Sequence, residues 1–100
     1  MTEALSVAER LAWLRLIRTD GVGPVTFHAL IARFGSASAA LAALPGIARR
    51  TGRALRPPSL AAAEAELDGV ERLGGRLLAM PDPAYPSWLR QIDGAPPILA

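Results

Sequence analysis

The segment Asp20-Gly21-Val22-Gly23-Pro24 separates two predicted helices, because it interrupts one apolar helical pattern and opens another. The first helix is predicted to begin at the capping box Ser6-Val7-Ala8-Glu9 and to run to about Arg18. Pro24 stands where a first-turn proline begins a helix, and Gly35 is the expected left-handed stop of that second helix. On the first helix we expect the buried residues to be Ala8, Leu11, Ala12, Leu16 and Ile17, and the solvated ones to be Arg10, Arg15 and Arg18.

The same pattern returns 25 residues further along the chain. The aligned pairs are Gly21 with Gly46, Val22 with Ile47, and Thr26 with Thr51. We therefore predict a second hairpin at Pro45-Gly46, between a short helix that Ser36 or Ser38 caps and that ends at Leu44, and another helix over 47–55. Ala48 stands in the place of the second glycine, so this copy is degraded. Two such helix-hairpin-helix copies would bury one shared core, which neither copy could do alone.

The remaining predicted elements follow a proline joint at 56–58. Ser59 is expected to cap a longer, connecting helix over 59–73. The apolar run 76–80 is bounded by glycines and a proline, and it predicts a buried parallel strand. A short helix over 83–92 and the beginning of a strand at 98–100 follow, so we expect the front of a longer protein. The predicted units are a helical domain over 1–56, a joint and connecting helix over 57–73, and the start of an α/β domain over 74–100.

Composition excludes several classes of protein. Hydrophobic residues make up 51% of the chain and charged residues 20%, so a core can form. Cysteine is absent and His28 is the single histidine, which rules out disulfide frameworks and zinc sites. No apolar run approaches the roughly 20 residues that span a bilayer, so we predict no membrane partner. With no catalytic constellation and no phosphate-binding glycine motif of the Walker or Rossmann type, we predict a protein that is not an enzyme and uses neither cofactor nor metal.

Charge is distributed unevenly along the chain. Residues 1–56 hold eight arginines and three acidic residues, a net charge of +5, whereas residues 57–100 hold three arginines and six acidic residues, a net charge of −3. The basic half can approach a polyanion. Glycines let a hairpin backbone come close to a phosphate, and the following helix offers free amides and its positive dipole end. The candidate nucleic-acid contacts are Gly21, Gly23, Thr26, Arg49, Arg50 and Arg53.

Three other side chains have simpler interpretations. Trp13 and Phe27 are predicted to be core residues rather than platforms for nucleic-acid bases. His28 is predicted to lie at the surface or at the boundary of the core, since no carboxylate or serine stands at a suggestive spacing. The glycine turn itself also has a purely structural interpretation, as a tight connection between two helices.

The segment after the joint resembles a known family. Tyr85-Pro86-Ser87-Trp88-Leu89-Arg90-Gln91-Ile92, followed by Ala95-Pro96-Pro97-Ile98-Leu99, is similar to the entry into the core of the DprA (Smf) family of DNA-processing proteins. The chain departs from that pattern where Gly94 replaces the usual aspartate and Asp93 falls one place early. The resemblance implies a helical domain of the tandem helix-hairpin-helix, SAM-like kind ahead of a Rossmann-like domain that starts here.

The resemblance also implies a function. Members of this family are cytoplasmic proteins that bind single-stranded DNA, protect it, and help load the RecA recombinase during natural transformation. It further implies a homodimer formed through the core, with Tyr85, Trp88 and Pro96-Pro97 in structural roles. Two other functions stay open: the helical domain is a protein–protein docking module without DNA contact, or the hairpins serve a repair or recombination factor that acts on duplex DNA.

Overall fold

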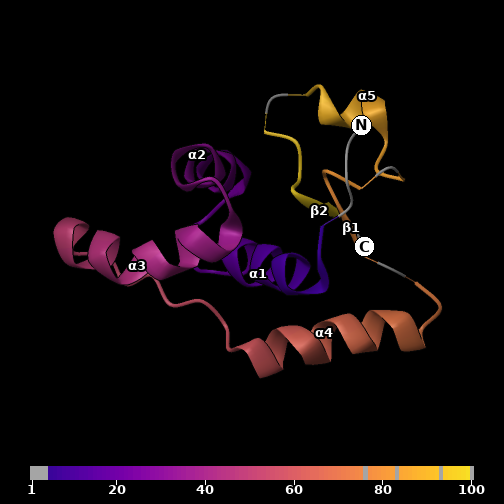
Figure 1. The fold of residues 1–100 in the computed structure, drawn as a ribbon, viewed down its shortest axis with the longest axis horizontal. Helices are drawn as coiled ribbons and strands as arrows, with labels where there is room; N and C mark the ends of the chain where they lie inside the picture. The colour runs from indigo at the N-terminus through magenta and orange to yellow at the C-terminus, as the bar shows by residue number, and fades with distance from the viewer. Residues whose placement is uncertain (1–4, 76, 83, 93, 100) are drawn as a thin grey trace.

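The computed structural model describes residues 5–75, 77–82, 84–92 and 94–99. The elements, in order, are α1 (Val7–Ile17), α2 (Pro24–Phe34), α3 (Ala37–Thr51), α4 (Leu60–Arg72), β1 (Leu78–Ala79), α5 (Ser87–Arg90) and β2 (Ile98–Leu99). Helix α1 lies at the centre, with α2 and α3 on one side of it and α4 on the other, and the segment with the two strands and α5 lies beside one end of α1 (Figure 1). The fold is therefore mainly helical, as predicted.

The helix ends confirm the predictions made from short sequence signals. Ser6 is the N-cap of α1, and its hydroxyl oxygen accepts a hydrogen bond of 3.1 Å from the Glu9 amide. Ser36 and Ser59 cap α3 and α4 in the same way. Gly35 ends α2 in the left-handed conformation, with φ of 89°. The capping box of α1 is only half formed, because the Glu9 carboxylate is directed to the N-terminus of α3 instead.

The core has two parts. The larger part joins α1, α2 and α3 around Trp13 and Phe27, whose rings pack edge to face with centroids 4.8 Å apart. Both side chains are buried, as predicted. The smaller part lies between α1 and α4, and its buried members are Leu11, Leu14, Ala63 and Leu77. Helix α1 therefore serves both parts, which explains why so many of its residues are buried.

Two arginines of α1 were predicted to be solvated, and the structure shows that they are not fully exposed. Arg10 and Arg15 are half-buried, and the Nε of Arg15 donates to the carbonyl oxygen of Pro58 at 2.9 Å. Arg18 is exposed, as expected, whereas Ala8 is exposed although it was expected inside. Because α4 and the C-terminal segment cover sides of α1 that a helical wheel leaves open, arginines on those sides acquire partners from distant parts of the chain.

The predicted second hairpin is wrong, and so is the separate helix over 47–55. Helix α3 runs without a break from Ala37 to Thr51, with Pro45 inside it. The buried stripe explains this continuity, because Ala37, Ala40 and Leu44 are buried and the partly buried Ile47 continues them at helical spacing across the proline. The stop is Gly52, with φ of 71°. The tandem arrangement is therefore reduced to one hairpin, between α1 and α2.

The strand predicted over 76–80 is present at Leu78–Ala79, but its predicted parallel orientation is wrong. Strand β1 pairs with β2 in an antiparallel register, with Leu78 opposite Leu99 and Ala79 opposite Ile98. Two strands of two residues each do not show the Rossmann-like continuation that the family resemblance implied. The predicted helix over 83–92 is shortened to α5, and four residues of the predicted C-terminal elements, Arg76, Pro83, Asp93 and Ala100, lie outside the described residues.

Within the described ranges of the chain, no single helix is long and apolar enough to cross a bilayer. Helices α2 and α3 reach the required length and composition only together, across a bend of 102°.

Candidate nucleic-acid interface

The hairpin between α1 and α2 is fixed at its base. Thr19 is buried, and its hydroxyl donates to the carbonyl oxygen of Arg15 at 2.8 Å. The carbonyl oxygen of Thr19 accepts from the Val22 amide at 3.1 Å, which closes the turn. Val22 is itself a buried member of the larger core. The hairpin is therefore held by hydrogen bonds at its base and by a hydrophobic anchor at its centre.

The two hairpin glycines have different surroundings. Gly21 has φ of +88°, and a Cβ atom at this position would lie 3.3 Å from Cδ2 of Leu55. Gly23 has φ of −92°, and a Cβ atom there would meet nothing within 4 Å. Gly21 is thus needed by the turn itself, whereas Gly23 leaves its backbone open to an outside group.

Helix α2 begins on that open side. Gly23 is its N-cap and makes no side-chain capping bond, and Pro24 is the first helical residue. The amides of Val25 and Thr26 lie in the first turn, where no carbonyl of the same helix can accept from them. An anion at this point would meet free N–H groups and the positive end of the helix dipole.

The C-terminal end of α3 lies next to the hairpin. A cavity of about 90 Å³ is lined on one side by Gly21 and Thr26 and on the other by Thr51, Arg53 and Leu55. The structure therefore brings three of the six predicted contacts, Gly21, Thr26 and Arg53, to one place. Gly23 lies beside them in the hairpin, while Arg49 and Arg50 do not line the cavity and belong to the last turn of α3.

Unpaired positive charge is concentrated at this end of the molecule. Arg49, Arg50 and Arg53 are exposed, and none of them makes an ion pair within the described part of the chain. By contrast, hydrogen bonds to Glu66 hold Arg18 and raise its pKa, against a smaller opposing effect of burial. Arg49, Arg50 and Arg53 therefore keep charge that is available to a polyanion, as do the exposed Arg33, Arg56 and Arg72, although Arg49 and Arg50 also complement the negative dipole end of α3.

Sequence reasoning missed two residues of this region. Thr51 lines the cavity, and its hydroxyl donates to the carbonyl oxygen of Ile47 at 2.8 Å. Leu55 approaches Gly21 closely, although it was placed in a helix that does not exist. The repeat signal pointed to Thr51 through its alignment with Thr26, but nothing in the local sequence shows that the chain after Gly52 turns back toward the hairpin.

The other singled-out side chains lie away from this interface. His28 is half-buried at the edge of the core, as predicted, with Nε2 2.9 Å from the carbonyl oxygen of Ala95. Tyr85 is buried, and its hydroxyl donates to the carbonyl oxygen of Pro96 at 2.6 Å. Trp88 is 68% exposed, so most of its side chain lies in solvent.

Comparison with known proteins places these features in a family. The model described as the DprA-like N-terminal HHH domain matches residues 7–69, from the first residue of α1 into α4. No curated protein matches the chain. The matched region contains the hairpin, the whole of α3 and all six candidate contacts. Since it covers more than half of the sequence, the chain belongs to the DprA family of DNA-processing proteins, whose N-terminal helical domain it carries.

Proposed function

We propose that this protein binds and protects single-stranded DNA in the cytoplasm and helps to load the RecA recombinase onto it, without making or breaking a covalent bond. One observation carries the DNA part of the proposal. Thr26, in the first turn of α2, lines the same cavity as Arg53, beside the hairpin that holds the open Gly23, and the unpaired Arg49 and Arg50 extend the positive surface along α3. The family membership supports DNA as the polyanion.

The binding mode follows from these groups. A phosphate can approach the backbone at Gly23 because no side chain stands there, and it would accept hydrogen bonds from the first-turn amides of α2. The exposed Thr26 hydroxyl can donate to a second oxygen of that phosphate. Arginines 49, 50 and 53 would then neutralise neighbouring phosphates. Such contacts carry no information about the base, so binding is expected to be independent of sequence.

The test is fluorescence anisotropy of a labelled single strand and of a matched duplex, titrated with the protein at several salt concentrations. Affinity for the single strand should fall with salt, with a logarithmic slope of about −0.7 for each phosphate contact. The double variant Arg49→Ala/Arg50→Ala should weaken binding and flatten this slope. Arg33→Ala, which removes an exposed arginine at the opposite end of α2, is the matched control.

A second variant separates binding from folding. Gly23→Asp places a favourable N-cap residue at the start of α2, so the fold is expected to persist. The added negative charge should nevertheless repel a phosphate from the hairpin and weaken DNA binding. Unchanged binding by Gly23→Asp would remove the hairpin from the interface, and a preference for the duplex would favour the repair or recombination alternative.

The docking alternative has an observation in its favour. Apolar side chains of Leu30, Leu44, Ile47 and Leu55 line the cavity below the hairpin, and Arg49 and Arg50 also stabilise the end of their own helix. A module of this kind would bind no DNA even at low salt. The RecA part is tested separately, by whether the protein shortens the lag in RecA's DNA-dependent ATPase activity on a single strand coated with single-strand-binding protein.

A further inference from the structure

The described residues of the C-terminal segment 77–99, which are 77–82, 84–92 and 94–99, pack onto the helical domain although they lie beyond the family match at 7–69. Leu77 belongs to the smaller core, together with Leu11, Leu14 and Ala63. Ala79 is 1% exposed and belongs to the larger core around Trp13 and Phe27. The segment therefore contributes side chains to both parts of the core.

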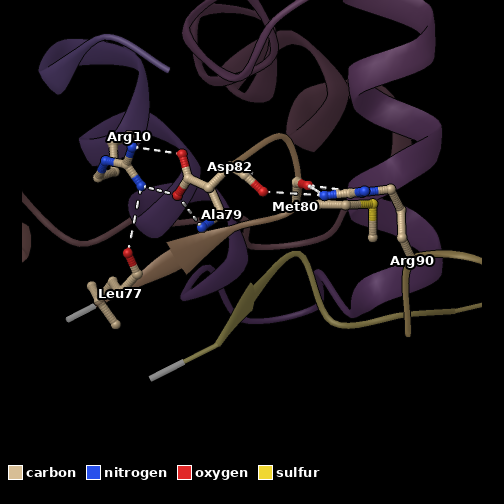
Figure 2. A network of polar contacts seen from close by, with 6 residues as sticks. All are labelled: Arg10, Leu77, Ala79, Met80, Asp82 and Arg90. Atoms are coloured by element: carbon tan, nitrogen blue, oxygen red, sulfur yellow. Dashed lines mark hydrogen bonds and ion pairs between the residues drawn. The ribbon is translucent and has the colours of Figure 1, made fainter. Parts of the chain in front are cut away.

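An ion pair fastens this segment to α1. The guanidinium of Arg10 donates to both carboxylate oxygens of Asp82, with Nη2 2.8 Å from Oδ1, and the two side chains point toward one another in Figure 2. Asp82 is 6% exposed, and its Oδ2 also accepts from the Ala79 amide at 2.8 Å. The hydrogen bonds to Asp82 raise the pKa of Arg10. A two-pronged arginine–carboxylate pair of this kind fixes orientation as well as distance.

A second group of contacts fastens the other end of the segment, to α2. The His28 ring nitrogen Nε2 lies 2.9 Å from the carbonyl oxygen of Ala95, and Ala95 is buried. Arg90 keeps the intervening chain folded, because its guanidinium donates to the carbonyl oxygens of Met80 and Asp82 (Figure 2). The Met80 amide in turn donates to the carbonyl oxygen of Pro97 at 2.9 Å.

We infer that residues 77–99 are a latch, closed by the Arg10–Asp82 pair, that locks the helical domain to the chain following it. This conformational device goes beyond DNA binding and does not depend on it. With the latch closed, the hairpin and the end of α3 keep one orientation relative to β2, and the helical domain does not swing on the linker around Gly74-Gly75. With the latch open, the helical domain and the segment 77–99 can reorient relative to each other.

Amide hydrogen exchange of the full chain, followed by mass spectrometry, tests the latch. In the unmodified protein, peptides within 77–82 should exchange at least about tenfold more slowly than an unstructured chain, because hydrogen bonds and burial protect their amides. Arg10→Gln should remove most of this protection while α2 and α3 stay protected. Arg18→Gln is the matched control, since its partner Glu66 is in an exposed pair, with side chains 52% and 35% exposed.

The exchange of peptides within 77–82 in the variants decides whether the Arg10–Asp82 pair closes the latch. Equal exchange of 77–82 in the unmodified protein and in Arg10→Gln would overturn the inference, and so would an equal effect of Arg18→Gln. If Arg10→Gln fails to fold, Asp82→Asn is the second variant, because it keeps the size of the side chain and an oxygen for the Ala79 amide. Faster exchange of 77–82 in Asp82→Asn, with α2 and α3 still protected, supports the latch, and unchanged exchange overturns it.

Discussion

The carboxylate of Glu9, on α1, accepts a hydrogen bond of 2.7 Å from the amide of Ala37, the first residue of α3. It also accepts from the hydroxyl of Ser38 at 2.8 Å and from Nε1 of Trp13 at 3.2 Å. One helix thus supplies a capping charge to the N-terminus of another, where the dipole favours an anion. The contact also joins the N-terminal end of α3 to α1.

Glu9→Gln should therefore lower the free energy of unfolding, by about 1–2 kcal/mol, because hydrogen bonds to a charged acceptor are replaced by weaker ones. Urea denaturation measures the change. Glu64→Gln, on the exposed face of α4, is the control and should have little effect. Equal effects of the two substitutions would mean that Glu9 contributes only as a surface charge.

The two hairpin glycines should respond differently to alanine. Gly21→Ala places a side chain at positive φ and against Leu55, so it should cost about 1–2 kcal/mol of stability. Gly23→Ala meets open space at an ordinary φ and should change stability far less. Thermal unfolding followed by circular dichroism compares the two variants, and a larger loss for Gly23→Ala would contradict the hairpin geometry.

Pro45→Ala should stabilise the protein. A proline in a helix interior lacks the amide hydrogen bond and crowds the preceding turn, so its replacement by alanine should stabilise the helix. Proline also restricts the unfolded chain, and the loss of that restriction reduces the net gain in the free energy of unfolding to about 1–2 kcal/mol. Pro24→Ala, at the first position of α2, is the control and should gain nothing. A loss of stability in Pro45→Ala would instead favour the turn that the sequence predicted at this point.

Stability should fall as the pH rises above about 10. Burial raises the pKa of the Tyr85 hydroxyl above its ordinary value of 10.0, and the positive charge of Arg90 offsets part of that effect. The unfolded chain therefore loses this proton at a lower pH than the folded chain does. The contribution of the neutral Tyr85 hydroxyl to stability is complete below about pH 10, and it is lost as the pH rises through the folded pKa. The chain has no lysine or cysteine, so no other side chain titrates between about pH 9 and 11.

Urea denaturation at a series of alkaline pH values measures this dependence, and the ultraviolet absorbance of the phenolate reports the ionisation directly. Tyr85→Phe should abolish the dependence in this range. It should also lower stability at neutral pH by about 1 kcal/mol, because the hydrogen bond to Pro96 is lost. A pH dependence that persists in Tyr85→Phe would assign it to another group.

The predictions that succeeded depend on neighbouring residues. Ser6, Ser36, Ser59 and Gly35 mark helix ends through contacts with residues up to four positions away, and the structure confirms all of them. A proline–glycine pair such as Pro45-Gly46 usually marks a turn, but here the pair lies inside a helix. Helix α3 continues through this point because the apolar stripe that runs on from Leu44 is buried, and that burial depends on the position of α1 and α2.

The candidate interface was predictable to a similar extent. Gly21 and Thr26 come together with Arg53 because the hairpin and the end of α3 are neighbours in space. The distinction between Gly21 and Gly23 could not be predicted, since it depends on a dihedral angle and on Leu55. Contacts such as Glu9 with Ala37 and Arg10 with Asp82 join residues 28 and 72 positions apart, and no local pattern indicates them.

The two tryptophans of the chain occupy opposite environments. Trp13 is 6% exposed at the centre of the helices, with its indole nitrogen bonded to Glu9, whereas Trp88 is 68% exposed on α5. Their intrinsic fluorescence therefore divides into a shielded component and one that dissolved quenchers reach freely. The molecule carries its own pair of optical probes, one for the integrity of the helical core and one for the surface of the C-terminal segment, and neither requires a label.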